Sequence, residues 1–273
     1  MNMKKTNPVS RTAYYCCGVR MLDAESNHPV LNDVYAARFM DEEGLKTFET
    51  FRKFKGPNAS NTARHRIIDD ILRDFISKHA EPVVIIVGAG FDSRAYRING
   101  GRWIELDEPQ VIDYKNEKLP ISECKNSLTR ISIRFGEESL KEKLQPFSSS
   151  QSVIVVVEGV LMYLNETLIN DLLDTLISIF PTHEIACDLM VKKFFEKYSY
   201  KIHNEIRGLG ATFTFLVDDP ANIFLRKGYR LENKNSTVLK AIDLGLLKIP
   251  RFILRWFMKP LVEGYAIYHF KKV

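Results

Sequence analysis

Residues 83–94 read Val-Val-Ile-Ile-Val-Gly-Ala-Gly-Phe-Asp-Ser-Arg. The first five are all β-branched, which is typical of a strand buried on both faces in a parallel sheet covered by helices. Gly88 and Gly90 then permit a sharp turn and remove the Cβ atoms that would keep a ligand away from the backbone. With Ala89 they form a predicted cofactor-binding turn, although glycine also occurs in turns for geometry alone. Ser93 stands where dinucleotide folds carry a third glycine, which disfavours a nicotinamide cofactor.

A second predicted strand, 102–107, ends in a carboxylate. Asp107 lies about 20 residues beyond the glycine turn, where nucleotide-binding folds place an acid for the ribose hydroxyls. The alternative is that Asp107 caps the helix that we expect from Pro109 through Lys118. Because Asp107 and the glycine turn follow neighbouring strands, both interpretations place it at the same edge of the sheet.

Further strands and helices alternate along the chain. We expect strands at 130–135, 152–157 and 183–188, helices at 137–144 and 166–179, and a closing strand at 264–270. This alternation predicts an α/β fold with a doubly wound parallel sheet. In such sheets ligands bind at the carboxyl ends of the strands, where Gly88, Asp107 and Glu158 all fall.

Two charged residues, Glu158 and Arg64, stand where an unpaired charge is unfavourable. Glu158 directly follows a buried strand, and a carboxylate there needs a cation, either a ligand ammonium or an internal arginine. Arg64 is expected in the first turn of a helix that begins after the Gly56-Pro57-Asn58 break, with a cap at residues 60–62. Because that end of a helix dipole disfavours a cation, Arg64 is expected to be exposed or to bind an anion.

Composition excludes several classes of protein. The 273 residues are 45% apolar and 27% charged, as in ordinary globular proteins, and the net charge of +5 is dispersed, so no nucleic-acid surface is indicated. The four cysteines lack C-x-x-C spacing, and the amino terminus has no apolar signal core. We therefore expect a cytoplasmic protein without stable membrane insertion, because no run is long enough to span a bilayer.

Several motifs occur in an order that resembles the leucine carboxyl methyltransferase family, which includes polyketide O-methyltransferases of the tetracenomycin type. They are Arg11-Thr12-Ala13, Asp33-Val34-Tyr35-Ala36-Ala37-Arg38, Val87-Gly88-Ala89-Gly90-Phe91-Asp92-Ser93-Arg94, Glu105-Leu106-Asp107-Glu108-Pro109 and Glu158-Gly159-Val160-Leu161-Met162-Tyr163-Leu164. The resemblance implies a class I S-adenosylmethionine-dependent methyltransferase with a Rossmann-like sheet of seven strands and a helical lid.

The same resemblance implies roles for single residues. Gly88 would meet the methionine and ribose parts of S-adenosylmethionine, Asp107 the ribose hydroxyls, Glu158 the ammonium and Arg64 the carboxylate. The sequence departs from the family after the third strand, where Arg134-Phe135-Gly136 replaces the usual Asp-Leu pair. Phe135 is then expected to cover the adenine.

We expect a single methyltransferase domain over residues 1–273. It comprises an amino-terminal helical cap segment (1–59), a cofactor-binding core (60–190), a lid and substrate region (191–262) and a closing strand (263–273). Residues 244–262 carry apolar residues and four cations at helical spacing, which favours a lid or dimer helix over a membrane-surface helix. The sequence leaves the oligomeric state open.

The expected activity is O-methylation of a small organic acceptor, either a carboxylate or a polyketide-like hydroxyl. Methylation of a protein carboxyl terminus and cofactor binding without catalysis are the alternatives. No metal is required. Tyr163 is expected to orient the acceptor oxygen, while His183 and His203 are possible bases. Because cations at Arg11, Lys192, Lys193 and Lys201 would attract anions, we expect carboxylic acids to be preferred to phenols, with a flat rate from about pH 6 to 8.

Overall fold

The computed structural model describes residues 11–148, 151–250 and 258–273. A seven-stranded sheet forms its centre, in the order β3-β2-β1-β4-β5-β7-β6. The strands are β1 (Val83–Val87), β2 (Arg102–Asp107), β3 (Ser127–Ser132), β4 (Val153–Val157), β5 (His183–Met190), β6 (Tyr229–Ser236) and β7 (Tyr265–Lys272). The first five are parallel, whereas β7 pairs antiparallel with both β5 and β6. The expected doubly wound α/β sheet is confirmed.

Helices surround the sheet. They are α2 (Ala13–Ala24), α3 (Glu42–Arg52), α4 (Lys55–Lys78), α5 (Arg94–Arg97), α6 (Pro109–Lys118), α7 (Leu140–Leu144), α8 (Glu166–Ile179), α9 (Lys192–Phe194), α10 (Tyr200–Gly208), α11 (Asn222–Arg226), α12 (Thr237–Asp243) and α14 (Lys259–Glu263). Short 3-10 turns occur at η2 (Ala36–Phe39), η3 (Ile121–Glu123), η4 (Gln145–Phe147) and η5 (Leu161–Tyr163), and η6 (Phe195–Ser199) is a π-helical segment.

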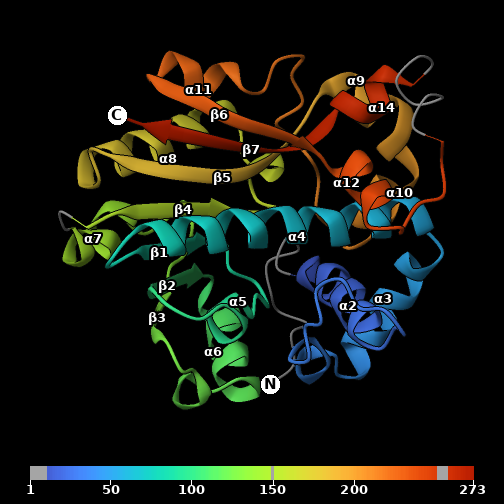
Figure 1. Cartoon of the computed structure of the whole chain (residues 1–273), viewed down its shortest axis with the longest axis horizontal. Helices are drawn as coiled ribbons and strands as arrows, with labels where there is room; N and C mark the ends of the chain where they lie inside the picture. The colour runs from blue at the N-terminus through green and yellow to red at the C-terminus, as the bar shows by residue number, and fades with distance from the viewer. Residues whose placement is uncertain (1–10, 149–150, 251–257) are drawn as a thin grey trace.

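Both faces of the central strands are covered, which explains their uninterrupted apolar sequence. Alternate residues of β1 point to opposite faces: Val83, Ile85 and Val87 pack with the apolar side of α8, and Val84 and Ile86 pack with α4. Helix α4 crosses one face of the sheet (Figure 1). The amino-terminal helices α2 and α3 gather at one end of the sheet with α9, α10 and α14 (Figure 1).

Helix α4 corrects one expectation. It begins at Lys55, so residues 56–58 lie inside its first turn, and Phe54 is the residue at the cap position. Proline is tolerated in a first helical turn because the amide it lacks would have no intrahelical partner there. The expected break and the cap at residues 60–62 are therefore wrong. Arg64 lies well inside the helix, and the argument from the helix dipole does not apply to it.

Three other elements differ from expectation. Strand β3 ends at Ser132, so Phe135 lies in the following turn, and the helix expected at 137–144 is the short α7. Strand β6 is absent from the expected elements, because its residues are mostly polar and exposed at the edge of the sheet. It lies within the expected lid region 191–262, which is thus not helical throughout. Of the helix expected at 244–262, residues 244–250 are not helical, 251–257 lie outside the described residues, and α14 follows.

Candidate active site

The turn after β1 brings backbone rather than side chains to the sheet edge. Gly88 and Gly90 adopt φ angles of +71° and +46°, which side chains other than glycine rarely adopt. A Cβ atom at Gly88 would lie 2.4 Å from Val160 Cγ2. The amides of Gly88 and Ala89 donate to the Leu106 carbonyl at 2.9 and 3.0 Å, which ties the turn to β2. The result is a fixed, open backbone surface of the kind that a cofactor can approach closely.

Asp107 supports this turn. Its Oδ2 accepts from the Gly90 amide at 2.5 Å and its Oδ1 from the Glu108 amide at 2.7 Å. Burial raises the pKa of Asp107 to about 6, because the two amide hydrogen bonds and the charge of Lys115 compensate only in part. Helix α6 has no side-chain cap at Glu108. A buried carboxylate with unused lone pairs fits a ligand that donates from hydroxyl groups.

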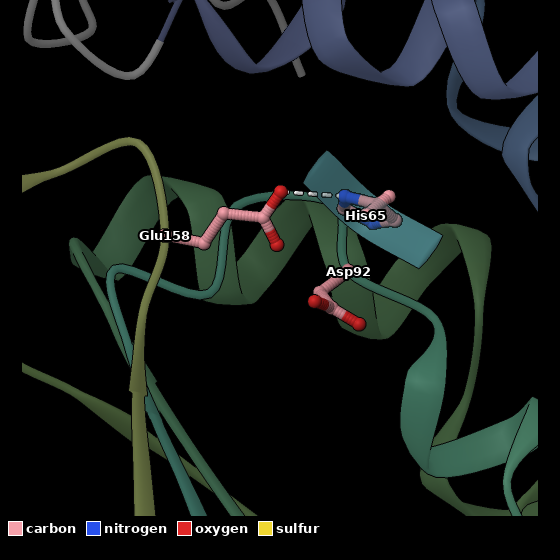
Figure 2. Close-up of side chains that lie close together, drawn as sticks. All are labelled: His65, Asp92 and Glu158. Carbon is pink, nitrogen blue, oxygen red and sulfur yellow. Dashed lines mark hydrogen bonds and ion pairs between the residues drawn. The ribbon is translucent and has the colours of Figure 1, made fainter. Parts of the chain in front are cut away.

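Glu158 stands at the centre of a buried ionic cluster. Its Oε1 lies 2.8 Å from Arg64 Nε and 2.6 Å from His65 Nδ1, and its Oε2 lies 2.8 Å from Arg94 Nη1. Burial alone would raise the pKa of Glu158, but the guanidinium groups of Arg94 and Arg64 and the hydrogen bond from His65 hold it well below its usual value. Figure 2 shows the carboxylate pointing from the end of β4 toward His65 on α4. The internal arginine that the sequence left open as a partner is present.

His65 is a site residue that the sequence did not single out. Burial lowers its pKa, so the ring is neutral at pH 7 and Nδ1 donates to Glu158. Nε2 is then left buried without a hydrogen-bond partner in the described part of the chain. In the sequence, only its position directly after Arg64 could have indicated that His65 belongs to the site. A ligand N–H group could satisfy this nitrogen.

Arg64 is held by three neighbours in addition to Glu158. Nη1 donates to Asp188 Oδ2 at 3.1 Å and to the Tyr265 hydroxyl at 2.8 Å, whereas Nη2 donates to the sulfur of Cys16 at 3.3 Å. Sulfur is a weak acceptor. The bond to Cys16 is therefore the contact of Arg64 that a ligand carboxylate would replace at least cost.

These residues belong to one continuous network of ion pairs. It joins four arginines to five carboxylates, with side chains at most 7% exposed: Arg20, Arg64, Arg94 and Arg97, and Asp33, Asp69, Asp92, Glu158 and Asp188. With His65 neutral, this network has one negative charge in excess. A cationic ligand is therefore electrostatically favoured beside it.

His65, Asp92 and Glu158 could in principle hold a metal, because one ligand atom from each lies within 4.8 Å of the others (Figure 2). Their carboxylates are, however, already paired with guanidinium groups of Arg64 and Arg94. A metal ion needs several open oxygen lone pairs, and these guanidinium groups already use part of them. The donor set suits an ionic organic ligand better than a metal.

A cavity of about 770 Å³ collects the expected cofactor residues. Its lining includes Arg64, Gly88, Ala89, Gly90, Asp107, Phe135 and Glu158. Phe135 is 38% exposed and its amide lies 3.3 Å from Glu108 Oε1, so its ring stands at the rim of the cavity. The volume lies within the range of about 300–1,000 Å³ that is usual for ligand sites. The seven residues therefore line one cavity of ordinary ligand size.

A second cavity of about 330 Å³ adjoins the first. The two share Thr12, Cys16, Arg64, Gly159 and Tyr163. Tyr163 packs edge-on against Phe213, with ring centroids 5.1 Å apart, and burial raises the pKa of its hydroxyl. A phenol that is harder to ionise can orient an oxygen but is a poor proton acceptor. Tyr163 thus stands at the junction where a cofactor and an acceptor would meet.

The expected bases and cations lie elsewhere. His183 bonds the Phe180 carbonyl and the Tyr229 hydroxyl, and burial lowers its pKa to about 4. His203 packs on Phe195 and Phe213. Neither histidine lines either cavity, nor do the four cations expected to attract an anionic acceptor, which are Arg11, Lys192, Lys193 and Lys201. Arg11 lies 3.6 Å from Glu43, and the three lysines are exposed. The four cations on which the expected preference for carboxylic acids rests thus lie outside the lining of both cavities.

Among the helices of the described residues, none has both the length and the apolar character needed to cross a membrane.

The sequence is similar to the sequences of known proteins. The model of the family "Leucine carboxyl methyltransferase" matches residues 13–177. The tetracenomycin polyketide synthesis O-methyltransferase TcmP of Streptomyces glaucescens is 26% identical over 243 residues, which cover 87% of this chain and 84% of that protein. The S-adenosyl-L-methionine-dependent methyltransferase dpfgK of Gibberella zeae is 24% identical over 219 residues, covering 75% and 74%.

Solved structures share the fold at low sequence identity. A DUF574 family protein from Streptomyces avermitilis has a TM-score of 0.60 at 10% identity, covering 92% of this chain and all of that one. The magnesium protoporphyrin IX methyltransferase of Synechocystis PCC 6803 has a TM-score of 0.51 at 11% identity, covering 86% and 97%. Similarity at this level extends to the sheet and its surrounding helices.

Proposed function

Because the chain belongs to the leucine carboxyl methyltransferase family, we propose that it transfers a methyl group from S-adenosylmethionine to an oxygen of a small organic acceptor. It is an S-adenosylmethionine-dependent methyltransferase. The observation that carries the proposal of a small acceptor is the pair of adjoining cavities, one lined by ionic and glycine residues and the other mostly apolar. Tyr163 belongs to both.

The first cavity fits the cofactor in its chemistry. Gly88 and Gly90 line the cavity and bring backbone to the methionine and ribose, and Asp107 offers a carboxylate to the ribose hydroxyls. Phe135 covers the adenine from the rim. The excess negative charge of the ionic network favours a ligand that carries an ammonium and a sulfonium group. Glu158 and the unpaired Nε2 of His65 are the groups we assign to the ammonium.

Arg64 is assigned to the methionine carboxylate. Its Nη2 exchanges the weak bond to Cys16 for a charge-assisted bond to oxygen, while Nε and Nη1 keep their bonds to Glu158 and Asp188. The guanidinium therefore needs no large movement. Since it also lines the second cavity, it separates the ionic part of the cofactor from the acceptor.

S-adenosylmethionine supplies, when bound, a methyl group on a positively charged sulfur that leaves readily. The protein then has to place an acceptor oxygen in line with that methyl group and exclude water. The Tyr163 hydroxyl lies at the junction of the cavities and orients the oxygen. The apolar second cavity holds the body of the acceptor.

Tritium-labelled methyl transfer tests the proposal. The protein is incubated with labelled S-adenosylmethionine and an extract separated into small molecules and proteins. Label in the small-molecule fraction that dissolves in organic solvent supports the proposal. Label in base-labile form on protein would show a protein carboxyl methyltransferase, and cofactor binding without any transfer would show a non-catalytic binding protein. The variant Asp113→Asn, on the exposed side of α6, is the control and should transfer label as the unaltered protein does.

A further inference from the structure

The acceptor cavity has a chemical character of its own. It is bounded by side chains of α2, α4, α10 and neighbouring segments, most of them aromatic or aliphatic. At about 330 Å³ it lies at the small end of the usual range for ligand sites. An acceptor of one or two fused rings suits such a space better than a peptide chain would.

Arg64 is the only charged residue among the described residues that line this cavity. Its three nitrogens already bond Glu158, Asp188, Tyr265 and Cys16. An acceptor carboxylate would have to leave water without gaining a free cation, which costs several kcal/mol for a charged group. The described part of the lining therefore offers no free cation to an anionic acceptor.

Most polar side chains of the lining already have partners. Ser60 donates to the Thr237 hydroxyl at 2.6 Å, and the Tyr265 hydroxyl donates to Asp188 at 2.6 Å. Asn61 differs: it is only 5% exposed, its Nδ2 donates to Cys16 at 3.3 Å, and its Oδ1 is buried without a hydrogen-bond partner in the described residues. Leaving a buried carboxamide oxygen unpaired costs about 1–3 kcal/mol, which a ligand donor would recover.

We propose that the cavity selects an uncharged aromatic acceptor whose hydroxyl group donates a hydrogen bond to Asn61 Oδ1. The inference rests on the proposed function and names its substrate class. In the transfer, a lone pair of the hydroxyl oxygen forms the bond to the methyl carbon as the carbon–sulfur bond breaks, and that bonding pair stays on sulfur. The hydroxyl proton passes to solvent water. Asn61 acts here as a specificity-determining residue.

Binding of three matched probes tests this assignment. Calorimetry at pH 7.5 compares 2-naphthol, 2-naphthoate and 2-methoxynaphthalene on protein saturated with S-adenosylhomocysteine. These probes share one ring system and differ in charge and in the ability to donate. We expect 2-naphthol to bind at least about tenfold more tightly than either of the others, since one loses the donor and the other adds a buried charge. Equal or tighter binding of 2-naphthoate, or no binding of 2-naphthol at all, overturns the inference.

The variant Asn61→Leu separates the hydrogen bond from the shape of the cavity. It should weaken 2-naphthol binding about tenfold and leave 2-methoxynaphthalene within about twofold. Asn222→Leu, at an exposed position of α11, is the matched control. An equal loss for both probes, or no loss for 2-naphthol, would contradict the role of Asn61. If Asn61→Leu does not fold, the comparison of probes on the unaltered protein still decides.

The proposed function and this inference fail separately. Titration of S-adenosylhomocysteine before the probes reports on the cofactor site alone. Cofactor binding followed by a preference for 2-naphthoate would leave the methyltransferase assignment intact and remove the neutral acceptor. Absence of cofactor binding would remove the proposed function, while the preference among the probes remains measurable on the protein alone.

Discussion

Changing Asp107 to Asn should uncouple cofactor binding from pH while the fold survives. The carboxylate is 7% exposed and accepts from the amides of Gly90 and Glu108. Burial raises its pKa from 3.8 to about 6, which corresponds to about 3 kcal/mol. A raised carboxyl pKa disfavours the charged form in the folded protein. This part of the folding free energy is therefore lost as pH rises from about 4 to about 6, and changes little above that.

The expected change in stability at pH 7 is small, because two effects oppose each other. Asn has a similar shape and no charge, so the variant avoids the free-energy cost of a buried charge. It loses one charge-assisted hydrogen bond from a backbone amide, worth about 1.5–3 kcal/mol. The free energy of unfolding should thus lie within about 1.5 kcal/mol of the unaltered protein. Cofactor affinity should fall at least about tenfold, because the ribose hydroxyls lose a charged acceptor.

The pH profile of the affinity gives the sharper result. Below about pH 6 the protonated Asp107 must release its proton before it can accept both hydroxyl bonds, so affinity should drop by up to about tenfold per pH unit. The Asp107→Asn variant should lack this slope. Glu108, whose pKa burial also raises, remains in both proteins, so the difference between the profiles belongs to Asp107.

Calorimetric titration of S-adenosylhomocysteine from pH 5 to 8, with denaturant unfolding at the same pH values, measures both quantities. Asp113→Asn, an exposed change on α6, should leave both as they are. Equal losses of stability and affinity in Asp107→Asn would assign Asp107 to a helix cap. Retention of the pH slope by the variant would refute its role toward the ribose.

Four further changes test other parts of the site. Glu158→Gln should lower the free energy of unfolding by about 3–5 kcal/mol by denaturant titration, because Arg64 and Arg94 lose a shared buried partner; a loss below about 1 kcal/mol would contradict this. Gly88→Ala should cost about 1–2 kcal/mol from its φ of +71° alone, and it should weaken cofactor binding because its Cβ would push against Val160 and shift the turn; unchanged binding would show that the turn does not hold the cofactor. Asp33→Asn should destabilise by a similar 3–5 kcal/mol or so at pH 7 and by less in acid, because Arg20 holds the pKa of Asp33 below its usual value against burial and this stabilisation is lost as pH falls. Tyr163→Phe should lower the rate of methyl transfer and leave the affinity for S-adenosylhomocysteine unchanged; a matching loss of affinity would place the hydroxyl in the cofactor site instead.

The sequence predicted the parallel half of the sheet well, because its signals are local. Residues 83–87 and 153–157 are runs of apolar residues buried on both faces, and 166–179 has a clean helical period that ends where α8 ends. Strand β6 could not be found in this way. Its polar residues are strand-forming only because β7 lies beside them, and that pairing joins distant parts of the chain.

The site shows the same division. Gly88, Asp107 and Glu158 follow strands directly, so their shared edge of the sheet could be inferred from order alone. The partners around Glu158 could not be inferred from the sequence, because Arg64, Arg94 and Asp188 come from three separate segments. The lining of the second cavity could not be predicted from the sequence either, because its residues also come from separate segments. Cations counted along the chain suggested an anionic acceptor, whereas in three dimensions they lie outside the cavity lining and Asn61 lines it.

Titration of S-adenosylhomocysteine into the unaltered protein at pH 7.5 is the most direct test of the central claim that the cavity at Gly88, Asp107 and Glu158 holds the cofactor. We expect one binding site per chain by calorimetry, with an affinity at least about tenfold weaker in Asp107→Asn. The absence of any heat at millimolar ligand, or equal binding by the unaltered protein and the variant, would contradict it.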